Sequence, residues 1–139
     1  MKIEYFTDEV KGLSKVTITY KNKIFTGIAK KDPVDIWSSF AGLTLAEMRA
    51  FLKLKKYEYK QAKERAEVCR KFVESLKQYK KFDPNSDTAK AVFRQLNCRI
   101  KEVNAIGDEI TNLELSIMKY LTGREKVLKS LKDKKDKNV

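Results

Sequence analysis

The hydrophobic pattern of this chain changes its period at Asp32-Pro33. Before this point, Val16–Tyr20 alternates apolar and polar residues, and Ile24–Ala29 is rich in β-branched and aromatic residues, as half-buried strands are. Lys21-Asn22-Lys23 between them predicts a tight turn, because Asn tolerates the left-handed backbone conformation. Loops of two and of three residues both fit. The pattern therefore predicts a β-hairpin, and Lys2–Phe6 is a candidate third strand.

The segment after the hairpin carries two helix-start signals. Asp32-Pro33-Val34-Asp35 combines a capping residue, a Pro suited to the first helical position and a carboxylate in the first turn. It predicts a short helix that contains Trp37 and ends near Gly42, with Trp37 packed under the hairpin. Thr44-Leu45-Ala46-Glu47 has the spacing of a capping box and predicts a second start. Two separate helices and one bent helix both agree with these signals.

Beyond Thr44 the apolar residues recur at steps of three and four along two long segments, as on the buried face of a helix. The first seam, which Lys55 alone interrupts, consists of Leu45, Met48, Leu52, Tyr59, Ala62, Ala66, Cys69, Val73 and Leu76. The second consists of Val92, Leu96, Ile100, Val103, Ile106, Ile110, Leu113, Ile117 and Leu121. The seams are similar in length and a short turn at Asp83–Asp87 joins them. They predict an antiparallel helical hairpin, with close packing at the small residues of the first seam.

The fold class expected from these elements is α+β and mainly α. An N-terminal β-hairpin, with three strands if Lys2–Phe6 joins it, packs on a long, coiled-coil-like helical hairpin. We expect one folded unit in three parts: residues 1–44 form the β-hairpin and short helix, 45–123 the helical hairpin, and 124–139 a basic tail that is helical or frayed. Gly123 is expected to end or interrupt the second helix. Two helices bury a limited core, so a homodimer that forms a four-helix bundle is a further expectation.

The formal net charge is +12, with a pI of about 9.6. Residues 45–80 contribute +6 of this charge and residues 124–139 contribute +4. Such an excess attracts nucleic acid or an acidic protein surface. Histidine is absent and there are two cysteines, so the usual general base and the usual metal-ligand sets are missing. We expect no catalytic residues, no metal and no cofactor. The sequence shows no secretory signal and no apolar stretch of membrane-spanning length, which favours a cytoplasmic protein without a membrane partner.

Basic residues recur at steps of three and four on the first long helix and form a basic stripe. The stripe consists of Arg49, Lys53, Lys56, Lys60 and Lys63. Possible secondary contacts are Arg70, Lys77, Lys126 and Lys129. A row of this kind fits a phosphate backbone or an acidic protein face, and it also fits a solvated helix face. It carries no base-reading pattern, because specificity needs groups placed at base edges.

Part of the sequence resembles a family of small phage and prophage proteins from Gram-positive bacteria. The resemblance rests on Thr26-Gly27-Ile28-Ala29, then Pro33-Val34-Asp35, then Gly42-Leu43-Thr44-Leu45-Ala46-Glu47-Met48-Arg49-Ala50. It covers about a quarter of the chain. Similar sequences carry Cys-His before the Pro, where this chain has Lys31-Asp32, so any role of that pair does not carry over. The family has no established activity, and the resemblance implies a mobile-element setting.

Three functions are consistent with these observations. The first is a non-enzymatic, phage-type accessory protein that binds and modulates a host or phage nucleic-acid-handling protein, including an anti-defence inhibitor. The second is a sequence-independent nucleic-acid-binding protein that uses the basic stripe. The third is a structural or assembly coiled-coil protein. Salt-dependent DNA binding, capture of a protein partner and self-assembly without either distinguish the three.

Overall fold

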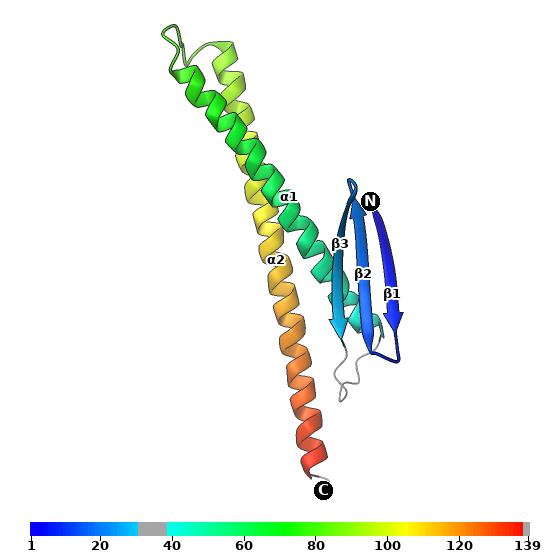
Figure 1. Ribbon diagram of the computed structural model, residues 1–139. Helices are drawn as coiled ribbons and strands as arrows, with labels where there is room; N and C mark the ends of the chain where they lie inside the picture. The colour runs from blue at the N-terminus through cyan, green and yellow to red at the C-terminus, as the bar shows by residue number, and fades with distance from the viewer. Residues whose placement is uncertain (31–38, 138–139) are drawn as a thin grey trace. The chain divides into compact units, whose positions relative to one another are not determined.

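A computed structural model describes the backbone of residues 1–30 and 39–137, with the side chains of 1–30, 41–123 and 129. The elements are β1 (Lys2–Asp8), β2 (Leu13–Tyr20), β3 (Lys23–Lys30), α1 (Ser39–Lys77) and α2 (Asp87–Lys137) (Figure 1). The predicted α+β, mainly helical fold is confirmed, with three strands in the sheet and two long helices packed together. The chain forms two compact units. The first comprises Met1–Leu54 with Thr111–Val139, and the second comprises Lys55–Ile110.

The sheet is antiparallel, with the strand order β1-β2-β3. Tyr20 pairs with Lys23, so the β2–β3 turn has two residues, Lys21 and Asn22. Both adopt positive φ values, 49° and 62°, as a type I′ turn requires. This turn decides between the two loop lengths that the sequence allows. It also fixes which side chains face α1, because strand residues alternate between the two faces of a sheet.

The core of the first unit lies between one face of the sheet and the first turns of α1. Val16, Ile18 and Ala29 of the sheet are buried, and so are four residues of α1: Leu45, Ala46, Ala50 and Leu54. Gly27 makes this packing possible, because a Cβ placed there would lie 1.9 Å from the carbonyl oxygen of Ala46. On α2, Tyr120 packs against the same core, and its hydroxyl donates a hydrogen bond to the Ala41 carbonyl at 2.9 Å.

Of the two alternatives for this segment, a boundary between separate helices near Gly42 and Thr44 is excluded, and a single helix agrees with the structure. α1 begins at Ser39 and continues without a break through Gly42 and Thr44, so neither residue ends or begins a helix. Gly42 is buried, and a glycine inside a helix costs only about 1 kcal/mol relative to alanine. Burial of the neighbouring apolar side chains on the sheet outweighs that cost. The start signal at Asp32–Asp35 and Trp37 lie outside the described residues.

The second unit contains the antiparallel helical hairpin. Ser86 caps α2, since its Oγ accepts a hydrogen bond from the Ala89 N–H at 3.2 Å. Ala62, Val73 and Ala89 are buried between the helices. Near the turn, the rings of Phe82 and Phe93 pack edge to face, with their centroids 6.3 Å apart.

The interruption expected at Gly123 is also wrong. α2 passes through this residue and continues to Lys137, so residues 124–137 are helical. No described residue lies within 4 Å of the position where a Gly123 Cβ would stand. Neither a turn nor a close approach of another segment therefore requires glycine at this position.

Candidate binding surface

The first two members of the basic stripe bind the edge of the sheet. Arg49 donates a hydrogen bond from Nη1 to the Ile28 carbonyl at 2.6 Å, and Lys53 donates from Nζ to the Thr26 carbonyl at 2.7 Å. In a hairpin with a two-residue turn, the even-numbered carbonyls of β3 point away from β2. Arg49 and Lys53 therefore satisfy carbonyls at the free edge of β3 and fix α1 against it. No side-chain pattern in the sequence predicts this role, since the partners are backbone atoms.

The other three members of the stripe lie in the second unit and face solvent. Lys56, Lys60 and Lys63 are exposed. Lys56 and Lys60 have no hydrogen bond or ion pair with any residue that the structure describes. The Lys63 ammonium lies over the Tyr59 ring, 5.3 Å from its centroid. We call these three residues the lysine row. Its charges remain available to an outside anion.

Arg70, which follows the lysine row on the same helix, is neutralised by ion pairs. Arg70 forms ion pairs with both Glu67 and Glu74. The Glu67 carboxylate raises the pKa of Arg70, and the Arg70 guanidinium lowers the pKa of Glu67 below its usual value. Arg70 therefore adds little net charge to this face.

The remaining secondary residues do not extend the row. The Lys77 ammonium lies over the Phe93 ring in the second unit, 5.7 Å from its centroid. Lys129 is exposed, but it belongs to the first unit. The side chain of Lys126 lies outside the described part of the chain. Of the residues with described side chains, Lys77 therefore shares the second unit with the lysine row and Lys129 does not.

An apolar groove lies beside the lysine row, between α1 and α2 of the second unit. Its volume is about 220 Å³. Its floor consists of Ala66, Leu96, Ile100 and Val103, and its rim consists of Lys63, Glu67 and Arg70. Ile100 is 44 % exposed although its spacing assigned it to the buried seam. Because two helices alone cannot enclose a wide seam, its flank stays open and is available to a partner.

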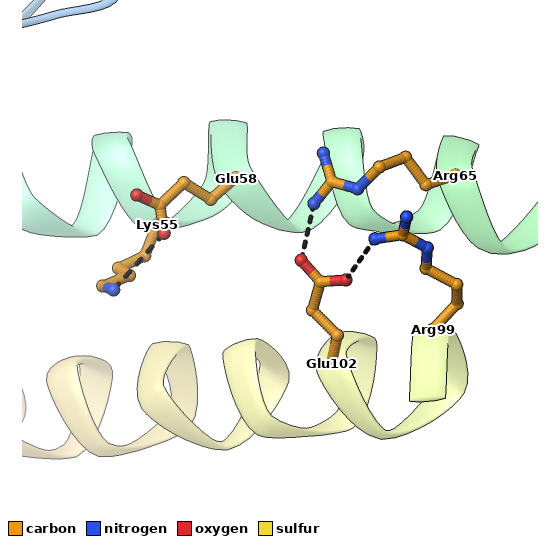
Figure 2. A network of polar contacts seen from close by, with 5 residues as sticks. All are labelled: Lys55, Glu58, Arg65, Arg99 and Glu102. Carbon is orange, nitrogen blue, oxygen red and sulfur yellow. Dashed lines mark hydrogen bonds and ion pairs between the residues drawn. The ribbon is translucent and has the colours of Figure 1, made fainter. Parts of the chain in front are cut away.

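A network of charges joins the two helices on the side away from this groove. Glu102 of α2 accepts hydrogen bonds from Arg65 of α1 at 2.7 Å and from Arg99 of α2 at 3.4 Å (Figure 2). These guanidinium groups, Arg65 foremost, lower the pKa of Glu102 below 4.5. A carboxyl with a lowered folded-state pKa stabilises the fold above its unfolded pKa. That contribution is lost as the pH falls below about 4.5 and through the lower folded-state value.

Lys55, the only polar break in the first seam, forms an ion pair across the hairpin. Its Nζ lies 2.6 Å from Glu109 on α2 and 3.3 Å from Glu58 on α1. Glu109, the largest cause, raises the pKa of Lys55 above 10.5, and Glu58 adds to this effect. The pair's contribution to stability is therefore present below about pH 10.5 and is lost as the pH rises through the higher folded-state pKa. The pairing also favours the register that places Lys55 opposite Glu109.

We predict opposite effects for two substitutions of Lys55. Lys55→Glu places a third carboxylate beside Glu58 and Glu109 and is expected to lower the free energy of unfolding by roughly 1–2 kcal/mol, less than for a fully buried pair. Lys55→Leu completes the apolar seam and leaves two carboxylates with access to water, so stability is expected to stay equal or rise. Urea denaturation followed by circular dichroism measures both. Equal destabilisation by both variants would contradict this account of the pair.

Other chemical groups of the described chain add no second candidate site. Cys69 is half-buried, Cys98 is exposed, and both thiols are free. In the described part of the chain, no group of three or more His, Cys, Asp or Glu side chains is placed to hold a metal ion. None of the described helices has a segment apolar enough to cross a membrane. The chain matches no protein-family model, no curated protein and no solved structure.

Proposed function

We propose that this chain is a non-enzymatic accessory protein that binds an acidic surface of a nucleic-acid-handling protein in the bacterial cytoplasm. The observation that carries this proposal is the lysine row, Lys56, Lys60 and Lys63, exposed beside the apolar groove of the second unit. The resemblance to small phage proteins favours a host or phage enzyme as the partner. A host defence nuclease that the chain inhibits is one such partner.

The composition of the surface favours a protein partner over a nucleic acid. Protein interfaces combine an apolar centre with a polar or charged rim, as the groove does with Lys63, Glu67 and Arg70. The groove floor adds apolar area that a phosphate backbone does not use. Three lysines also neutralise few phosphates, whereas they suffice to complement a small cluster of carboxylates and to orient a partner.

Capture from lysate with a charge-matched control tests this proposal. The tagged chain is incubated with bacterial lysate, with and without nuclease treatment, beside the double variant Lys56→Glu/Lys60→Glu. The control variant Lys80→Glu/Lys119→Glu makes the same change in net charge at exposed positions outside the row. We expect the wild type and the control to retain one protein partner after nuclease treatment, and the row variant to lose it. Capture that disappears with nuclease, or that the row variant retains, would contradict the proposal.

Direct nucleic-acid binding is the second candidate, and the net charge of +12 favours it. If the lysine row contacts phosphates, the logarithm of the affinity for duplex DNA should fall with the logarithm of salt concentration with a slope of roughly −0.9 per lysine. Lys56→Glu/Lys60→Glu should then weaken binding to all sequences alike and reduce the slope by about 2. Fluorescence anisotropy over a salt series measures both. Sequence-dependent binding, or an unchanged slope, would exclude this role for the row.

A further inference from the structure

The three-stranded sheet has two edge strands, β1 and β3. Among the described residues, side chains of α1 bond to the outer edge of β3. Arg49 and Lys53 bond to two of the four outward carbonyls of β3, those of Ile28 and Thr26. The register assigns the free groups of β1 in the same way. The even-numbered residues of β2 form their backbone hydrogen bonds with β3, so the odd-numbered residues of β2 form theirs with β1. Their partners on β1 are Lys2, Glu4, Phe6 and Asp8. The N–H and C=O groups of Ile3, Tyr5 and Thr7 therefore point away from the sheet.

β1 lacks most of the features that usually protect an edge strand, and its charged residues, Lys2, Glu4 and Asp8, lie on the face away from α1. It contains no proline, and its pairing with β2 runs from Lys2 to Asp8 without a bulge. Its side chains on the helix-facing side are Ile3, Tyr5 and Thr7, none of them charged. No residue in the described part of the chain bonds to their backbone groups. Tyr5 and Phe6 are each 54 % exposed. A regular, partly apolar edge strand whose outward backbone groups are free is a template for pairing with another strand.

We propose that β1 pairs in antiparallel orientation with β1 of a second copy of this chain, with Tyr5 opposite Tyr5. This register uses all three free residues of each strand, since Ile3 of one copy then faces Thr7 of the other. It forms about six inter-chain hydrogen bonds, two for each such residue pair. It also places Lys2 of each copy opposite Asp8 of the other, which is a favourable charge pair at both ends. The two exposed tyrosines pack against each other at the centre.

The partly covered edge of β3 favours an assembly that stops at two copies. A sheet with two open edges would continue to add strands and form a filament. On β3, two of the four outward carbonyls, those of Thr26 and Ile28, accept hydrogen bonds from Lys53 and Arg49, which hinders the addition of a strand there. The β1 pairing is isologous, so both copies use the same edge and the assembly closes as a dimer. This interface lies on the sheet, apart from the four-helix bundle that the helical seams suggest, and it goes beyond the proposed function.

Proline scanning of β1 tests the interface. The Tyr5 N–H does not bond to β2, so Tyr5→Pro should keep the intramolecular sheet while removing the donor and placing a ring at the edge. Tyr5→Thr is the matched control, since it also removes the aromatic ring but keeps the N–H. Sedimentation equilibrium in the micromolar range should show a dimer of the 16.2 kDa chain for the wild type. Tyr5→Pro should weaken dimerisation at least about tenfold, because both hydrogen bonds of the central pair are lost. Tyr5→Thr should weaken it less.

Cysteine cross-linking tests the register and does not depend on the proline variant's folding. In a background with Cys69→Ala and Cys98→Ser, Tyr5→Cys should form a disulfide-linked dimer under mild oxidation. Residues directly opposite each other in such a pair have Cα atoms about 5.5 Å apart, within disulfide range. Phe6→Cys, which would face Glu4 of the second copy, should cross-link poorly. A wild-type monomer at all concentrations, a dimer that tolerates Tyr5→Pro, or equal cross-linking at both positions would overturn the proposal.

Discussion

Replacing Gly27 with alanine is expected to destabilise the first unit by about 3 kcal/mol or more. The added Cβ would lie 1.9 Å from the Ala46 carbonyl oxygen and 2.5 Å from the Ala50 amide nitrogen. Both are backbone atoms of α1, so no side chain can rotate away and the helix itself would have to move from β3. Overpacking of this kind costs more than the usual range of about 1–3 kcal/mol. Urea denaturation followed by circular dichroism measures the change.

Two other glycines provide matched controls for this experiment. Nothing lies within 4 Å of a Cβ at Gly123, and at Gly107 the nearest atom is a Tyr59 ring carbon at 3.5 Å. Both residues are inside α2, where alanine is favoured over glycine by up to about 1 kcal/mol. Gly123→Ala should therefore stabilise the protein and Gly107→Ala should be neutral or stabilising. If Gly27→Ala behaves like either control, β3 and α1 do not approach as closely as the structure shows.

Replacing Ala62 with leucine is expected to destabilise the helical hairpin by roughly 1–3 kcal/mol. Ala62 is fully buried between α1 and α2, so three additional carbon atoms must displace neighbouring side chains or separate the helices. Ala66 is the matched control, because it lies one helical turn away but is half-buried in the floor of the open groove. Ala66→Leu should change stability little. Thermal unfolding of both variants measures the difference, and equal effects would contradict the burial of Ala62 between the helices.

The fold class was predictable because periodicity reports directly on burial. The alternation in Val16–Tyr20 and the steps of three and four after Thr44 each predicted the element that the structure contains. The turn at Asp83–Asp87 between the two helices followed from local chemistry in the same way. Signals that depend on weak propensities were less reliable. Gly42, Thr44 and Gly123 looked like helix boundaries, yet α1 and α2 continue through them. The unfavourable helix propensity of one glycine, about 1 kcal/mol relative to alanine, is too small to end a long helix.

The candidate site was only partly predictable, because spacing places charges on a face without identifying their partners. Arg49 and Lys53 share the face of Lys56, but they bind carbonyls of β3, which no side-chain pattern reveals. The role of Gly27 was hidden for the same reason, since it depends on the backbone of α1. The sequence did mark Lys55 as an exception within an apolar seam. Its partner Glu109 became clear only when the structure gave the register of the hairpin.

The most direct test of the proposed function is the affinity of the purified chain for its captured partner, measured by calorimetry with and without the two charge reversals. Lys56→Glu/Lys60→Glu should weaken binding at least about tenfold, since it replaces two attractions with two repulsions at one interface. Its unfolding curve should stay close to that of the wild type, because exposed charges contribute little to stability. The control Lys80→Glu/Lys119→Glu should keep the wild-type affinity. Equal affinities for the row variant and the control would contradict the assignment of the lysine row as the binding surface.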